Sequence, residues 1–147
     1  MGHDHAIAQI AAQAEAKGLR LTPVRRRTLE LLHEGGRAKG AYDLLEMLKP
    51  EGLGKTPVSV YRALDFLVEH GFAHKIEGLN AFVACGHTHA GHDHAPAFLV
   101  CRDCRRVDEA HLAPQDTGVG GAALKAGFTV ERIVVEALGL CADCATQ

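Results

Sequence analysis

"KTPVSVYRALDFLVEHGFAHKIEGLNAFVAC", residues 55–85, changes its hydrophobic period part-way along, and this change decides the fold. The first part repeats apolar residues at helical spacing, which predicts a helix over residues 57–70 with Thr56 as its N-cap and Pro57 at its first position. After Gly71 the period becomes two. The segments "FAHKIE" and "NAFVAC" then predict two short strands joined as a hairpin.

Three more helices are predicted upstream, at residues 6–17, from Thr22-Pro23 to Gly35-Gly36, and at about 40–49. Helices followed by a β-hairpin form the outline of a winged helix-turn-helix, in which the helix at 57–70 enters the major groove. The apolar stripes of the four helices predict these buried residues: Ile7, Ile10, Ala11, Ala14, Val24, Thr28, Leu31, Leu32, Ala41, Leu44, Leu45, Leu48, Val60, Ala63, Leu64 and Leu67.

The second half of the chain contains more predicted strand. "APAFLVC" and "RRVDEAHL" predict a second hairpin with "CRDC" at its turn, residues 118–126 a short helix, and "FTVERIVVEALGLC" a strand. We therefore expect an α+β protein, with an N-terminal winged helix-turn-helix at residues 1–84. A His-rich hinge at 85–94 and a small α/β domain at 95–147 follow.

Four of the five cysteines form two CxxC pairs, Cys101/Cys104 and Cys141/Cys144. Two residues between cysteines let both thiolates face one ion from a tight turn, and two such turns complete a tetrahedral zinc site. A thioredoxin-like redox pair is disfavoured because neither pair sits between a strand and a helix of a βαβ unit. The spacing predicts a structural zinc that ties the chain end to the hairpin.

The fifth cysteine, Cys85, precedes a run of four histidines. A thiolate with imidazoles and a carboxylate favours zinc over manganese or iron(II), so a second metal site is expected at the domain junction. Its candidate ligands are Cys85, His74, His87, His89, His92, His94, His111, Asp93, Asp108 and Glu109. No general base in a recognised context and no HxE…PCxxC deaminase motif is present, so sensing is favoured over catalysis.

The helix at 57–70 also carries the candidate DNA contacts. Arg62 is placed to meet guanine edges, while Tyr61, Ser59 and Thr56 are placed to meet phosphates. The segment "VRRR" at 24–27, with Arg25, and Tyr42 are expected to contact the DNA backbone. Residues 1–75 hold 11 basic and 9 acidic side chains in a chain of net charge −2, which permits this role for the N-terminal half.

The bulk composition narrows the class of protein further. The 147 residues, 47% of them hydrophobic, suffice for one medium or two small folded domains. No apolar run approaches the length of a membrane span, and the N-terminal sequence does not resemble a secretory signal. With metal-ligating rather than disulfide-bonded cysteines, we expect a cytoplasmic protein that binds no membrane.

At this point the sequence resembles the ferric uptake regulator family. The resemblance is carried by "GLRLTPVRRRTLELL", "AYDLL", "SVYRALDFLVEHGFAHKIE", "FLVCRDCRRVDE" and "GLCADC", and it covers roughly residues 8–145. "AYDLL", "VYRALDFL", "HK" and "GLCADC" point to the zinc-responsive branch. The resemblance implies a homodimeric, metal-dependent repressor of zinc-uptake genes with a C-terminal dimerisation domain. On this resemblance we expect the chain to bind a palindromic double-stranded operator and to have neither enzyme activity nor a small-molecule substrate.

The resemblance also implies roles for single residues. The family's structural zinc falls on Cys101, Cys104, Cys141 and Cys144, and the regulatory zinc of its zinc branch on His74, Cys85, His94 and Glu109, giving about two Zn²⁺ per subunit. DNA contacts carry over to Tyr42 and Arg62. Many iron-type members place "HDH" closer to the first CxxC pair than this chain does. Because of that departure, the resemblance assigns no role to His87, His89 and His92. They are candidates for a third, weaker site with His111, or they are exposed to solvent.

Other functions remain open from the residues alone. One alternative is a family member that senses another metal (iron or manganese), haem or peroxide. A second is a zinc buffer or metallochaperone that uses the His-rich segment, and a third is a zinc hydrolase. A buffer predicts that deletion of residues 87–92 removes most metal binding, whereas a hydrolase predicts an open coordination position.

Overall fold

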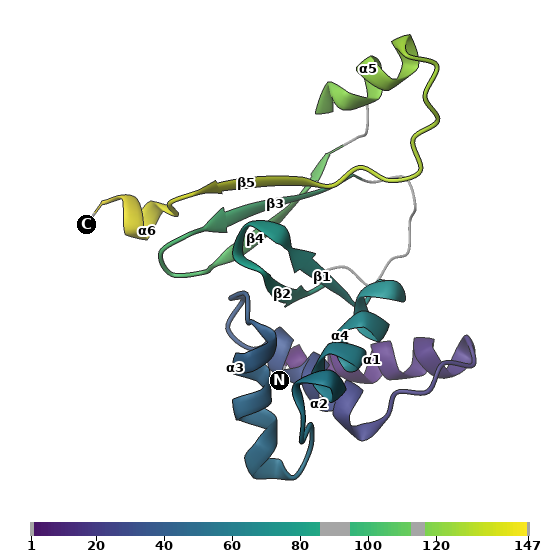
Figure 1. The fold of residues 1–147 in the computed structure, drawn as a ribbon, viewed down its shortest axis with the longest axis vertical. Helices are drawn as coiled ribbons and strands as arrows, with labels where there is room; N and C mark the ends of the chain where they lie inside the picture. Colours follow the sequence, from purple (N-terminus) through teal and green to yellow (C-terminus); the bar gives the residue numbers. More distant parts are fainter. Residues whose placement is uncertain (1, 86–94, 113–116, 147) are drawn as a thin grey trace. The chain divides into compact units, whose positions relative to one another are not determined.

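The computed structural model describes residues 2–85, 95–112 and 117–146, and it divides into two compact units, residues 1–88 and 89–147 (Figure 1). The N-terminal unit comprises α1 (Gly2–Ala16), α2 (Pro23–His33), α3 (Ala41–Leu48), the 3-10 turn η1 (Lys49–Glu51), α4 (Pro57–Glu69), β1 (Ala73–Ile76), the 3-10 turn η2 (Glu77–Leu79) and β2 (Ala81–Ala84). The C-terminal unit comprises β3 (Ala95–Cys101), β4 (Val107–Leu112), α5 (Val119–Lys125), β5 (Val135–Gly139) and α6 (Ala142–Ala145).

Both Thr-Pro dipeptides begin a helix, as predicted. The Thr22 hydroxyl accepts a hydrogen bond from the backbone N–H of Arg25 at 3.4 Å and caps α2. At α4 the bonding is reciprocal, because Thr56 Oγ1 accepts from the Ser59 N–H at 3.3 Å and Ser59 Oγ accepts from the Thr56 N–H at 3.4 Å. Such a capping box satisfies amide donors that the helix itself cannot, and it fixes where α4 starts.

The four helices of the N-terminal unit bury the apolar stripes that the sequence predicts. Ala11 and Val24 are only half-buried, and the fully buried Leu29 widens the stripe of α2 beyond the predicted positions. Thr28 is buried as well, and its hydroxyl donates to the backbone carbonyl of Val24 at 2.7 Å, so this polar group carries no unpaired donor into the core. The buried face of α4 packs against this core, and the opposite face of the helix is exposed.

The predicted hairpin forms the wing. Strands β1 and β2 are antiparallel and pair Ala73 with Ala84 and His74 with Val83. The turn before β1 is closed by the Phe72 N–H, which donates to the carbonyl of Leu67 at 2.8 Å. The sequence did not predict the short bridge formed by Lys39 and Phe82, which exchange backbone hydrogen bonds of 2.9 and 2.8 Å.

The C-terminal unit is a three-stranded sheet in the order β4-β3-β5, with β3 antiparallel to β4 and parallel to β5. The predicted hairpin around "CRDC" is confirmed. The predicted strand over residues 128–141 is too long, because only Val135–Gly139 is strand. Strand β3 starts at Ala95, but its pairing with β5 begins only at Ala97, opposite Val135, so the residues before Val135 do not take part in this pairing. Among the described residues, no helix combines the length and apolar character that crossing a membrane requires.

Gly54 is the glycine on which the packing of α3 against α4 depends. It is buried with φ +57°, and an added Cβ would lie 3.1 Å from Leu48 Cδ1 and 3.3 Å from Val60 Cγ2. We expect Gly54→Ala to lower the free energy of unfolding by about 2–4 kcal/mol, through backbone strain plus overpacking. Chemical denaturation measures this change.

Gly36→Ala is the matched control, because Gly36 also has a positive φ, +62°, but has nothing within 4 Å of an added Cβ. It isolates the backbone cost of about 1–2 kcal/mol. Equal losses in the two variants would show that the contacts of Gly54 with Leu48 and Val60 contribute nothing.

Candidate metal centres and nucleic-acid interface

The four cysteines of the CxxC pairs converge in the C-terminal unit. Cys101 ends β3 and Cys104 lies in the turn that leads to β4, while Cys141 is the N-cap of α6 and Cys144 lies within that helix. The pairing of β5 with β3 brings the two pairs together, because it sets Cys101 opposite Gly139. The backbone N–H of Arg102 donates to the Gly139 carbonyl at 2.9 Å and holds the same register.

The spacing of the four sulfurs fits a tetrahedral metal site. All four sulfur atoms lie within 4.8 Å of one another, and Cys104 Sγ lies 3.7 Å from Cys141 Sγ. Four sulfurs at about 2.3 Å from a central zinc lie about 3.8 Å apart in an ideal tetrahedron. The donor set therefore matches zinc in both chemistry and size.

The backbone around Cys101 favours a thiolate. Hydrogen bonds from the backbone N–H groups of Cys141 and Cys104 lower the pKa of the Cys101 thiol to about 6, against the opposing effect of burial. Hydrogen bonding to the Cys141 side chain and burial raise the pKa of the Cys144 thiol. The turn that supplies the Cys104 N–H is closed by Arg105, in the left-handed region at φ 64°. Because the thiolate is the ligating form, the turn prepares Cys101 for metal.

The wing brings together a second pair of candidate ligands. His74 lies in β1, and Cys85 follows β2, where its N–H extends the hairpin by donating to the Phe72 carbonyl at 3.0 Å. Both side chains are half-buried, and a ligating nitrogen of His74 lies within 4.8 Å of the Cys85 sulfur. The hairpin thus offers an imidazole and a thiolate to one ion, a pair of ligands that suits zinc.

The predicted ligands other than His74 and Cys85 lie outside the wing. Glu109 lies on β4, where it pairs with Phe98, and its side chain is half-buried. His111 lies on the same strand and pairs with Pro96. The predicted ligands outside the described residues are His87, His89, His92, Asp93 and His94.

The exposed face of α4 carries most of the predicted DNA contacts. Arg62 is exposed, and Tyr61 is 39% exposed beside it. Thr56 and Ser59 hold the start of the helix through their capping box. Tyr42, at the start of α3, is 65% exposed, which is high for a large aromatic side chain. These positions are accessible to a macromolecular partner.

The arginines of "VRRR" make contacts within the protein. The Arg25 guanidinium stacks on the Phe66 ring, 3.8 Å from its centroid, and donates to the Arg20 carbonyl at 2.7 Å. Arg26 and Arg27 form ion pairs with Glu30 at 3.2 and 3.1 Å, and Arg27 also pairs with Glu51 at 2.9 Å. Arg25 thereby ties α2 to the face of α4, whereas its two neighbours are neutralised by carboxylates.

Sequence reasoning missed one exposed residue of α4. Val58 is 57% exposed and lies one helical turn before Arg62. The spacing of four residues could have identified it, because residues i and i+4 share a helix face.

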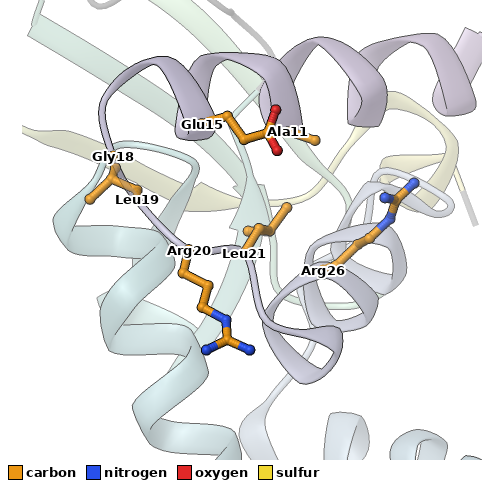
Figure 2. Close-up of a pocket in the computed structure, with 7 residues that line it drawn as sticks. All are labelled: Ala11, Glu15, Gly18, Leu19, Arg20, Leu21 and Arg26. Carbon is orange, nitrogen blue, oxygen red and sulfur yellow. The ribbon is translucent and has the colours of Figure 1, made fainter.

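An open depression of about 430 Å³ lies in the N-terminal unit (Figure 2). It is lined by Ala11, Glu15, Gly18, Leu19, Arg20, Leu21 and Arg26, which come from α1, α2 and the loop between them. Its charged groups are one carboxylate and two guanidinium groups, and it contains neither cysteine nor histidine.

The sequence model of the Ferric uptake regulator family matches residues 16–137. The chain belongs to the ferric uptake regulator family. The zinc uptake regulation protein of Escherichia coli (strain K12) is 39% identical to it over 140 residues, which cover 92% of this chain and 81% of that protein.

Solved structures of family members agree with the fold. A zinc uptake regulator complexed with zinc and DNA has a TM-score of 0.90 at 35% identity, covering 99% of this chain and 97% of that one. The holo form of XcZur has a TM-score of 0.83 at 36% identity, covering 97% and 99%. The predicted family and the predicted fold, an N-terminal winged helix followed by a smaller α/β domain, are confirmed.

Replacement of Cys101 and Cys104 by serine removes two thiols of the four-cysteine cluster. We expect this double variant to lose one tightly bound zinc per chain and to melt at a lower temperature, because structural zinc contributes on the order of 10 kcal/mol to folding. Native mass spectrometry counts the metal, and circular dichroism follows the melting. Cys85→Ser is the control and leaves this zinc in place; an unchanged zinc count in the double variant contradicts the assignment.

Proposed function

We propose that the chain is a zinc-responsive transcriptional repressor that binds a palindromic double-stranded operator as a homodimer. The observation that carries the proposal is the position of the His74–Cys85 pair on the wing hairpin directly after α4. A metal bound there acts on the element next to the candidate recognition helix. The similarity to a zinc uptake regulator complexed with zinc and DNA supports the same function.

Two kinds of metal site are proposed, with about two zinc ions per subunit. Cys101, Cys104, Cys141 and Cys144 hold the structural ion. His74, Cys85, His94 and Glu109 are proposed as the regulatory ligands, and His87, His89, His92 and His111 as a third, weaker set. Zinc supplies positive charge and fixed tetrahedral geometry to these ligands.

The C-terminal unit supports the proposed dimer. Its described residues expose large apolar side chains, among them Leu124, Phe128 and Leu138, with Leu124 82% exposed. Exposed apolar surface of this kind marks interaction sites. A two-fold dimer would present two copies of α4 about one DNA turn, roughly 34 Å, apart, and this spacing explains why a palindrome is expected.

The DNA contacts are proposed for the N-terminal unit. Arg62 meets a guanine edge, while Tyr42, Thr56, Ser59, Tyr61 and Arg25 meet the sugar-phosphate backbone. Because the chain would act on DNA and keep its thiols as metal ligands, we place it in the cytoplasm.

Metal dependence of DNA binding tests the proposed function. We expect the zinc-loaded protein to bind a duplex selected from a random library about 5–150-fold more tightly than chelated protein, the usual range of coupling between two sites. Fluorescence anisotropy at fixed salt measures the affinity. Cys85→Ser protein in zinc should match the chelated wild type. Equal affinity with and without zinc would reject the mechanism, and a stronger response to manganese or iron(II) would favour a sensor of another metal.

Arg62→Ala should weaken binding to the selected duplex by about 1–3 kcal/mol and relax the preference for one base pair, because a bidentate guanine contact is lost. Glu69→Ala is the matched control, since Glu69 is also exposed on α4 but near its C-terminal end. A uniform loss of affinity across all sequences would instead assign Arg62 to a phosphate.

A further inference from the structure

The chemical character of the exposed side chains of α4 changes along the helix. Val58 stands in the first turn, Tyr61 and Arg62 one turn later, and the acidic residues Asp65 and Glu69 follow. Carboxylates are repelled by DNA phosphates, so close contact with DNA is restricted to the first two turns. The apolar Val58 therefore lies inside the contact region and beside Arg62.

Val58 has no packing role in the described structure that explains it. The buried face of α4 consists of Val60, Ala63, Leu64 and Leu67, and Val58 is 57% exposed away from that face. A single exposed valine is common on protein surfaces and proves nothing alone. Here it is accompanied by a second feature, the absence of any acidic residue in the first turn of α4, where the helix dipole favours acids.

We propose that Val58 is a specificity-determining residue that contacts the C5 methyl group of a thymine next to the base contacted by Arg62. The thymine methyl is the apolar group that base pairs display in the major groove, and aliphatic side chains recognise it by contact. The step of four residues from Val58 to Arg62 spans about 6 Å of helix. Base pairs are stacked about 3.4 Å apart, so the thymine lies one or two base pairs from the guanine.

The inference rests on the proposed function and deepens it, because it specifies which base chemistry the recognition helix selects. The capping box of Thr56 and Ser59 supports it mechanically, since it fixes the first turn in which Val58 lies. A branched side chain such as valine also has restricted rotamers, so little entropy is lost on contact.

The experiment removes the thymine methyl alone. A duplex is selected from a random library by the zinc-loaded full-length protein, and each thymine is then replaced in turn by deoxyuridine. For wild type we expect one position, within two base pairs of the guanine assigned through Arg62→Ala, at which affinity falls about fourfold per methyl, the value for one buried methyl-sized group. At that position Val58→Ser should lose less than about twofold.

Two variants serve as controls. Val58→Thr keeps one γ-methyl group and should retain most of the thymine preference. Val119→Ser makes the same change at a valine of similar exposure, 53%, in the C-terminal unit, and should leave the preference unchanged. The ratio of affinities for thymine and deoxyuridine duplexes is insensitive to general loss of stability, which melting temperatures monitor separately.

The possible outcomes separate this inference from the proposed function. Zinc-dependent, sequence-specific binding in which no thymine position responds, or in which Val58→Ser shows the same loss as wild type, overturns the role of Val58 only. Selection that yields no sequence preference at all overturns the proposed function and the inference with it.

Discussion

The convergence of four thiols is the constraint on which the C-terminal unit depends, because its own apolar core is small. Among the described residues of that unit, burial is confined to Ala97, Phe98, Val100 and Cys101, and several large apolar side chains face solvent. A sheet of three strands with so little buried surface has a marginal folding free energy. In the proposed function, metal ligation by Cys101, Cys104, Cys141 and Cys144, together with burial of the exposed side chains in a dimer, would supply what the core lacks.

The N-terminal unit is built on the opposite principle. Helices α1 to α4 bury a continuous apolar cluster with the wing, and its members include Leu32, Leu44 and Leu64. Such a unit does not need metal to hold α4 in place. In the proposed function, metal at its wing is therefore free to act as a signal, whereas metal at the four cysteines would be a condition of folding. On this division, one of the two proposed metal sites serves folding and the other serves the response to zinc.

The wing is the physical link between metal and DNA in the proposed function. Glu69 ends α4 and Ala73 begins β1, so His74 is only a short turn away from the recognition helix. The hydrogen bond from the Phe72 N–H to the Leu67 carbonyl closes that turn. A ligand that restrains His74 and Cys85 restrains the frame of α4 as well, and by thermodynamic reciprocity DNA binding then strengthens metal binding.

The sequence by itself determined the elements and the ligand chemistry. Two Thr-Pro caps fixed the starts of α2 and α4, the helical stripes fixed the core, and the change of period at Gly71 fixed the wing, because these features depend on neighbours within a few residues. The CxxC spacing identified four thiols as one site for the same reason.

Only the tertiary structure decided the features that depend on partners distant in the chain. The parallel pairing of β5 with β3 sets which cysteines meet, and it extends only over Val135–Gly139 of the longer predicted strand. Stacking on Phe66 decided the position of Arg25, and the direction of the core decided that Val58 faces outward. Local sequence cannot specify these outcomes, since long-range packing and strand pairing select among conformations that the local pattern leaves equally favourable.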